Sequence, residues 1–390
     1  MDGPHETPEF IDEGVPFLSV DNIVDNGIDF AKTRFISSQA HSGFSVKCKP
    51  QRDDVLLTKA ASVGRVAVVN TDRDFNVWSP IAVLRANQDV LLARFLSYSL
   101  MSHQVQAQID LACTSNTQRN LAMGDIGSLQ IPLKPVDEQR RIADYLDAET
   151  ARIDALIAAR NFQTNLLIER LTSNITGIFS RFRHDEWPLK YLANKIGSGK
   201  TPTGGADVYQ DDGVLFLRSQ NVHRGELRLA DAAYISRDID SQMSSTRVKP
   251  GDVLLNITGA SIGRCAHVTS DLPSANVNQH VCIIRPNPGI DGELVSAALL
   301  TPFVQEQIRV LQVGGNREGL NFEQVGNLVV KIPAQEADRE TALELIRRAT
   351  SDSTLLIALL AASVSRLVER RRALITAAVT GQFEIPGAAA

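Results

Sequence analysis

The sequence has few cysteines and no closely spaced pair of them. Four cysteines are spread over 390 residues without a CxxC motif, which argues against a disulfide framework and favours buried, reduced thiols. No apolar run approaches the roughly 18 residues that a membrane span needs, and the first residues lack the pattern of a secretory signal. We therefore expect a cytoplasmic protein without a membrane segment.

An excess of positive charge is also missing. The chain has 40 lysines and arginines against 45 aspartates and glutamates, a net charge of −5. A protein that binds nucleic acid unaided usually shows a basic footprint. A role on nucleic acid therefore requires local basic patches, or partners that supply the phosphate contacts.

Motifs for catalysis are absent as well. Residues 197–201 (GSGKT) invite comparison with a phosphate-binding loop, but Asn194 stands where its first glycine belongs, and Pro202 opposes the helix that must follow. His280 and Cys282 alternate on one predicted strand, yet two ligands do not make a metal site. The sequence has no HxxxH, no HExxH, no [DE]-x-K and no aromatic-ended Asn/Asp-Pro-Pro motif. We predict a chain that is not an enzyme and that binds no metal or cofactor itself.

Two long stretches have helical periodicity. In the first, from residue 136 to 178, apolar residues recur at spacings of three and four, with no proline and with no glycine before Gly177. About 40 residues in a helix would reach roughly 60 Å, which favours a coiled coil or spacer over an ordinary globular helix. The alternative is a domain-crossing helix with no further role. The second stretch runs from residue 338 to 380. The residues expected to pack are Ile142, Leu146, Ile153, Leu156, Leu167, Leu356, Leu359, Leu367 and Leu374.

The sequence before each long helix is a repeat. Segments of the first copy return in the same order about 199 residues later, for example residues 15–23 as 214–222 and 126–129 as 325–328. This offset is that of a duplicated domain. Strands are expected at 15–20, 54–57, 66–69 and 81–84, and at 214–217, 252–257, 264–269 and 281–285, with helices at 90–109 and 292–311. The first copy is shorter at its start, where an opening strand or helix of the second copy has no match.

This pattern predicts an α+β protein with two similar domains and two long helices. The expected boundaries are 1–135 for the first domain, 136–184 for the central helix, 185–335 for the second domain, 336–384 for the final helix and 385–390 for a tail.

Polar loops after the predicted strands are the candidate recognition sites. Ser-x-Gly-Arg occurs in both copies, at 62–65 and 261–264, and a turn-rich polar loop follows each short helix near 114–121 and 314–321. Such side chains contact base edges and phosphates, although a structural turn with a solvated arginine explains each loop too. The candidates are Thr58, Lys59, Ser62, Arg65, Gln118, Arg119, Asn120, Thr258, Ser261, Arg264, Asn316 and Arg317.

Three segments resemble one known family. Residues 135–147 (PVDEQRRIADYLD) open the first long helix, residues 369–382 (ERRRALITAAVTGQ) close the second, and residues 200–202 (KTP) precede the second copy. Through these segments the chain resembles the specificity subunit of type I restriction-modification systems. The resemblance covers nearly the whole chain. The second helix departs from the pattern, because it opens with AQEADR.

The resemblance implies a function. Each domain would be a target recognition domain for one half of a split, asymmetric site in double-stranded DNA. The long helices would pack antiparallel as a coiled-coil spacer and would bind the modification (methyltransferase) subunits, which the restriction (motor-nuclease) subunits join. S-adenosylmethionine, ATP and Mg²⁺ would belong to those partners. The alternative is a protein-interaction adaptor of the same architecture that does not recognise DNA.

Overall fold

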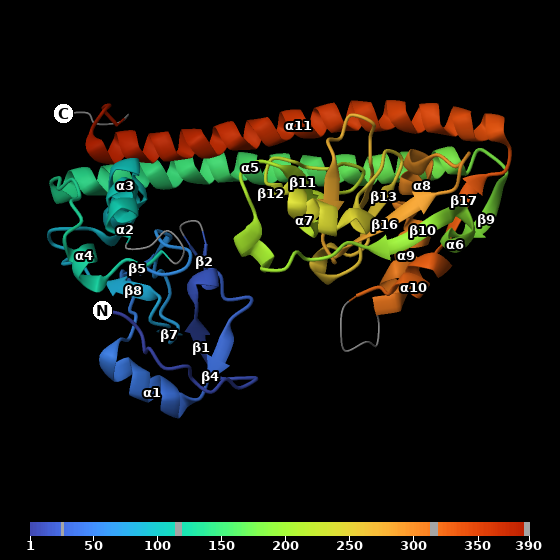
Figure 1. The fold of residues 1–390 in the computed structure, drawn as a ribbon. Coiled ribbons are helices and arrows are strands. Elements are labelled where there is room, and N and C mark those ends of the chain that lie inside the picture. The colour runs from blue at the N-terminus through green and yellow to red at the C-terminus, as the bar shows by residue number, and fades with distance from the viewer. Residues whose placement is uncertain (25–26, 114–118, 313–318, 386–390) are drawn as a thin grey trace. The chain divides into compact units, whose positions relative to one another are not determined.

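The computed structural model describes residues 1–24, 27–113, 119–312 and 319–385. The chain divides into two compact units (Figure 1). The first consists of residues 1–161 with 361–390, and the second of residues 162–360. Each unit therefore contains one α+β domain together with one half of each long helix, and we describe the two units separately.

The first unit is built around a sheet whose central strand is apolar on both faces. The sheet order is β6-β5-β8, and β5 pairs antiparallel with both neighbours. Val55 and Leu57 of β5 face a core shared with helices, whereas Leu56 faces a second core under a small sheet of order β4-β1-β7. The strands of this unit are β1 Val15–Leu18, β2 Ile23–Val24, β3 Gly27–Ile28, β4 Arg34–Ile36, β5 Val55–Thr58, β6 Val66–Val68, β7 Asn76–Val77 and β8 Ile81–Leu84.

The second unit repeats this plan with one more strand in the main sheet. Its order is β10-β16-β13-β14, and the small sheet is β12-β11-β15. Val253 and Leu255 face the helical core and Leu254 the other core, as in the first copy. The strands are β9 His184–Pro188, β10 Ala193–Ser198, β11 Val214–Leu217, β12 Ala233–Ile235, β13 Val253–Asn256, β14 Cys265–His267, β15 Ala275–Val277, β16 Val281–Pro286 and β17 Val329–Pro333.

Each predicted short helix is two helices. In the first copy the chain turns at Ser102, whose backbone is extended and whose hydroxyl accepts a hydrogen bond from the amide of Val105. In the second copy the break falls before Pro302, whose fixed φ suits the first turn of a helix. The single helices expected at 90–109 and 292–311 are thus wrong. The helices of the domains are α1 Ser38–Lys47, α2 Ala93–Met101, α3 His103–Ala112, α4 Met123–Gly127, α6 Leu189–Leu192, α7 Arg237–Gln242, α8 Gly292–Leu299, α9 Pro302–Gln312 and α10 Phe322–Asn327.

The first residues of the chain run beside β8. Met1 exchanges backbone hydrogen bonds with Val83, of 3.0 and 2.7 Å, and Asp2 forms a bridge with Ala82. In the second copy the end of β10 lies beside β16 in the same way. The expected missing strand is thus represented by these two residues, which take the place of the last residues of β10.

The long helices are α5 (Val136–Phe179) and α11 (Glu336–Thr380). In the first unit Ile142 and Leu146 share a core with Ile375 and Val379. In the second unit residues Ile175, Ile178 and Phe179 share a core with Ala342, Leu343 and Ile346. In each unit the early part of one helix meets the late part of the other, so the paired halves are antiparallel (Figure 1). The expected fold class, α+β with two long antiparallel helices, is confirmed.

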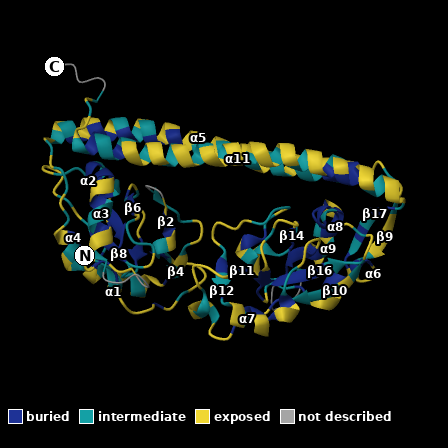
Figure 2. Cartoon of the chain, turned by 45° about the horizontal axis from the view of Figure 1, so that its top comes forward, coloured by how far each residue is buried: buried dark blue, intermediate teal, exposed yellow. Residues whose placement is uncertain are grey.

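The burial of the helices separates the residues expected to pack into two groups (Figure 2). Ile142, Leu146 and Ile153 are buried, and Leu167, Leu367 and Leu374 are half-buried. The other three are exposed, with Leu156 of the first unit at 44%, and Leu356 and Leu359 of the second at 48% and 59%.

One expectation about membranes is corrected in α11. A window of 18 residues in this helix has a mean hydropathy of 1.4, because alanine and leucine dominate it. By length and composition alone it could cross a membrane, contrary to the expectation that no stretch approaches this limit. The exposed leucines of α11, which include Leu356 and Leu359, contribute to this hydropathy.

Candidate nucleic-acid interface

Polar side chains gather at one end of the main sheet of the second domain. Strands β10 and β13 end there and β16 and β14 begin there, because neighbouring strands in the sheet are antiparallel. The loops at this end, which we call the polar sheet end, contain residues 199–201, 257–264 and 278–280. They bring together Thr201, Thr258, Ser261, Arg264, Gln279 and His280.

A chain of hydrogen bonds orders four of these side chains. The Thr201 hydroxyl donates to Oε1 of Gln279, whose Nε2 lies 2.9 Å from Nε2 of His280. Since that amide nitrogen can only donate, His280 accepts at Nε2 and carries its proton on Nδ1. Nδ1 lies 2.6 Å from Oγ1 of Thr258 and donates to it. The Thr258 hydroxyl hydrogen is then available to a ligand. Gln279 and His280 were not among the predicted contacts, although their place directly before an apolar strand could have indicated them.

The Ser-x-Gly-Arg turns are held from behind by the same residue type in both copies. Gly64 and Gly263 have φ of +93 and +84, a left-handed conformation that favours glycine. Nε2 of Gln106 donates to the carbonyls of Gly64 and Leu100 at 3.0 and 2.7 Å. Gln305 makes the same two bonds to Gly263 and Leu299, of 3.0 and 2.8 Å. The position of the arginine in each turn is therefore fixed by the core.

The predicted residues of the first copy lie at the corresponding end of its sheet. Thr58 is fully buried, and its hydroxyl accepts from the amide of Arg65 at 2.9 Å and donates to the carbonyl of Ser62, so it shapes the turn and is closed to solvent. Lys59 is mostly buried and lies 3.3 Å from a carboxylate oxygen of Asp2. Arg65 is exposed, and its Nη1 donates to the carbonyl of Ile23 at 3.3 Å.

The remaining predicted residues border these turns. Arg119 is exposed and paired with Asp110, and Asn120 forms a bridge with Ala60. In the second copy Gly319 forms the matching bridge with Thr258. Asn120 and Gly319, from the polar segments predicted near 114–121 and 314–321, thus lie at the sheet end in both copies. Gln118, Asn316 and Arg317 lie outside the described residues.

Backbone hydrogen bonds show which residues of the two copies correspond. The amide of Thr58 bonds to the carbonyl of Arg65, and that of Asn256 to the carbonyl of Arg264, so Asn256 is the counterpart of Thr58. Thr258 therefore corresponds to Ala60, and His280 to Pro80. The two copies thus differ by one residue in the spacing between the strand and the turn.

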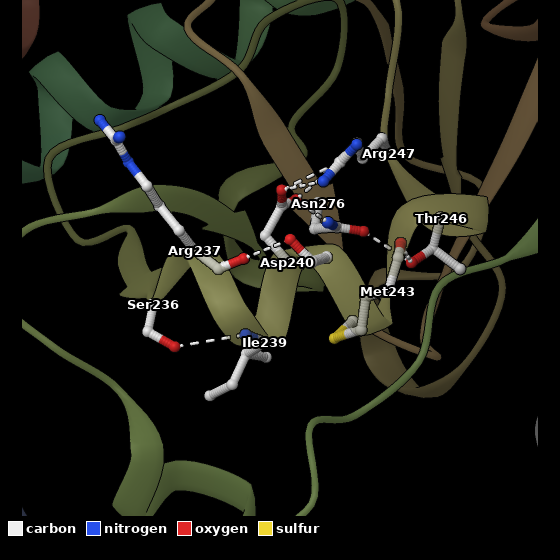
Figure 3. A network of polar contacts seen from close by, with 9 residues as sticks. Ser236, Arg237, Ile239, Asp240, Met243, Thr246, Arg247 and Asn276 are labelled. Atoms are coloured by element: carbon white, nitrogen blue, oxygen red, sulfur yellow. Dashed lines mark hydrogen bonds and ion pairs between the residues drawn. The ribbon is translucent and has the colours of Figure 1, made fainter.

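A mostly buried polar network connects α7 to β15 of the small sheet in the second domain (Figure 3). Asp240 accepts from Nε of Arg247 at 2.9 Å and from Nδ2 of the fully buried Asn276 at 2.6 Å. The Thr246 hydroxyl lies 2.6 Å from Oδ1 of Asn276. In the first copy Asn76 is equally buried, and its Oδ1 lies 2.6 Å from Nδ1 of His41. Asp240, Thr246 and Asn276 are buried and bond to one another or to Arg247, so we assign this network to the stability of the fold.

Comparisons with known proteins place this architecture. Residues 6–163 match the family model described as type I restriction modification DNA specificity domain. The chain is 25% identical over 309 residues to the EcoBI specificity subunit of Escherichia coli, covering 70% of this chain and 64% of that one. It is 24% identical over 279 residues to the putative MjaX specificity subunit of Methanocaldococcus jannaschii, covering 64% of each. The matches thus span somewhat less than two thirds of these relatives.

A solved structure shares the fold. A chain from a study of complex assembly and conformational transition of the type I R-M system superposes with a TM-score of 0.58 at 16% identity, covering 95% of this chain and 92% of that one. The fold and the sheet ends define a protein with two domains of one design, and the family model matches the first of them together with the first part of α5. The chain is thus similar to the specificity subunits of type I restriction-modification systems, and the resemblance found in its sequence is confirmed.

Proposed function

We propose that this chain is the DNA-recognition subunit of a type I restriction-modification complex, in which each domain recognises one half of a bipartite, asymmetric site. The observation that carries the proposal is that the two copies share the glutamines that hold their turns but differ in the side chains at their sheet ends. The glutamines that hold the Ser-x-Gly-Arg turns are the same in both copies, whereas Thr258 and His280 stand where the first copy has Ala60 and Pro80. Because base contacts specify a sequence, two such ends would recognise different half-sites.

We propose further that the long helices bind the other subunits. In the helix halves of the second unit Phe162, Leu166, Leu355, Leu356 and Leu359 are exposed at 46 to 64%. Contiguous uncovered apolar surface marks a protein-interaction site. The occupants we propose are modification subunits, with restriction subunits joining that core.

We infer that the catalytic chemistry belongs to those partners, in the cytoplasm. They would bind S-adenosylmethionine, ATP and Mg²⁺. The glycines of residues 197–201 support this division of labour, because Gly197 lies inside β10 and no helix begins at Lys200 or Thr201. A phosphate loop needs a helix N-terminus there. This segment includes the end of a strand and lacks that helix.

Methylation mapping tests the proposal. Cells expressing the chain with its modification subunit should acquire methylation at a split motif of two short half-sites with a constant gap. Gln279→Ala and Thr258→Ala should relax the motif in one half-site only, because both side chains belong to the second domain. Gln307→Ala, on α9 away from the sheet end, is a control for the general effect of losing a glutamine. An assembled complex that leaves no methylated motif would refute the proposal.

A further inference from the structure

A hairpin of the second domain packs against the polar sheet end. It comprises residues 218–228, and Val222 and Leu227 bridge its two sides. Nδ2 of Asn256, at the end of β13, donates to the carbonyl of Ser219 at 2.8 Å. The amide of Gly225 donates to the carbonyl of Cys265 at 2.8 Å. The hairpin is thus fixed beside Arg264, which directly precedes β14.

This hairpin is basic. It contains Arg218, Arg224 and Arg228 against one acid, Glu226, which pairs with Arg228 at 2.6 Å. Arg224 is exposed and Arg264 half-buried, and in the described part of the chain neither guanidinium has a hydrogen-bond or ion-pair partner. A guanidinium without a partner is well suited to bind a phosphate in two-pronged fashion.

A histidine lies among these arginines. The Nε2 of His223 lies 3.0 Å from the carbonyl oxygen of Gln220. Burial lowers the pKa of His223, and the nearby charge of Arg228 lowers it further. Since Arg264 acts in the same direction, the positive charges of the hairpin and of the turn converge on one place.

The first copy has the opposite charge at the matching place. Its hairpin pairs Ile23 with Ile28, and residues 19–29 contain three aspartates and neither lysine nor arginine. Asp21 is exposed. Arg65, the counterpart of Arg264, turns its Nη1 inward to the carbonyl of Ile23. One backbone design thus carries a basic hairpin in one domain and an acidic hairpin in the other.

We propose that the basic hairpin, residues 218–228, together with Arg264 binds the phosphate backbone of duplex DNA next to the half-site of the second domain. This inference rests on the proposed DNA-recognition function. It assigns the backbone contact to the second domain and leaves the acidic hairpin of the first without one. The two domains then contribute unequally to affinity and to its dependence on salt.

Salt titration of the assembled complex tests this assignment. Each phosphate contact contributes about 0.9 to the slope of log affinity against log salt for duplex DNA. Arg224→Gln should therefore make the slope shallower by about 0.9, which over a fourfold change in salt is about 3.5-fold. Affinity for the mapped site and for an unrelated duplex should fall together. Arg309→Gln is the matched control, since Arg309 is an exposed arginine of the same unit that pairs with Glu306 on α9.

The outcomes separate the two proposals. A slope for Arg224→Gln and Arg264→Gln equal to that of the wild type, with the methylated motif intact, would overturn the phosphate site and leave the recognition function standing. A changed motif at an unchanged slope would also overturn it, since that is the effect of a base contact. Asp21→Arg should steepen the slope, because it adds positive charge to the acidic hairpin. If the wild-type complex has no preferred site at all, the recognition function itself fails.

Discussion

Gly199 is the residue whose replacement should damage the second domain most sharply. A Cβ added there would lie 1.7 Å from the carbonyl oxygen of Val277 and 2.6 Å from that of Asn278. Both contacts are backbone, so no side chain can rotate to relieve them, and the segment after β10 must move away from β15. The amide of Gly199 bonds to the carbonyl of Val281 at 3.2 Å, and that of Lys200 to the carbonyl of Val277 at 3.2 Å. Both hydrogen bonds would be lost.

The expected cost of Gly199→Ala follows from these terms. Forcing atoms into a filled space costs about 1–3 kcal/mol, and each hydrogen bond contributes about 0.5–1.5 kcal/mol. We expect a loss of about 2–6 kcal/mol in the free energy of unfolding. For a unit of this size the melting temperature falls by about 2–4 °C per kcal/mol, so the transition of the second unit should drop by about 4–24 °C in a thermal melt followed by circular dichroism.

Gly197→Ala is the matched control. Gly197 lies two residues earlier in β10, and a Cβ there meets no atom within 4 Å. This variant should melt within about 1 °C of the wild type, because a strand accepts alanine at an open position. Thr201 follows Gly199 closely and bonds to Gln279, so Gly199→Ala should also weaken methylation of the second half-site. Identical melting curves for Gly199→Ala and Gly197→Ala would refute the inference that the backbone of Val277 lies too close to Gly199 for a Cβ.

Three further predictions concern other parts of the chain. Cys113 should be the one cysteine that a thiol reagent modifies in the folded protein, because the other three are buried and burial raises the pKa of two of them to about 12; modification of two or more at equal rates would contradict this. Asp147→Arg should cost about 2 kcal/mol in a urea titration, since it removes the acceptor of a buried tyrosine and repels Arg94, and Arg94→Glu added to it should restore part of the loss. Leu359→Asp should weaken co-purification with a modification subunit and leave the melting temperature unchanged, because Leu359 is exposed. Ile346→Asp, at a buried position, should lower the melting temperature. Equal effects of the two variants on melting would contradict the assignment of Leu359 to a binding surface and of Ile346 to the core.

The periodic patterns predicted the scaffold. The first long helix begins at Val136 as the sequence indicates, because Pro135 ends the preceding segment and acidic residues occupy the first turn. The central strands were found because their buried residues include a short continuous apolar run, Val253 to Leu255 in β13. The break at Ser102 was missed, since a serine that caps one helix does not interrupt the apolar spacing across it.

Only some of the residues at the sheet ends could be predicted from the sequence. The Ser-x-Gly-Arg turns could be predicted because both copies contain them. A comparison of the two copies detects the residues that both need for the same fold. Gln279 and His280 have no counterparts of the same type in the first copy, so the comparison of copies passed over them. Their proximity to Thr201 and Thr258 depends on strand pairing across 78 and 22 residues, which no local pattern encodes.

Duplication therefore separates the residues that maintain this fold from those that give each domain its own surface. The pairing of Arg85 with the buried Asp54 recurs as that of Arg285 with the buried Asp252, at 2.7 Å in both copies. Breaking such a pair leaves a buried charge uncompensated, which costs several kcal/mol, so neither copy is free to vary it. The exposed side chains of the sheet ends and hairpins, such as Arg224 and Asp21, carry no such constraint, because they face solvent. A change there alters what the domain contacts without altering how it folds, and the opposite charges of the two hairpins are what this freedom permits.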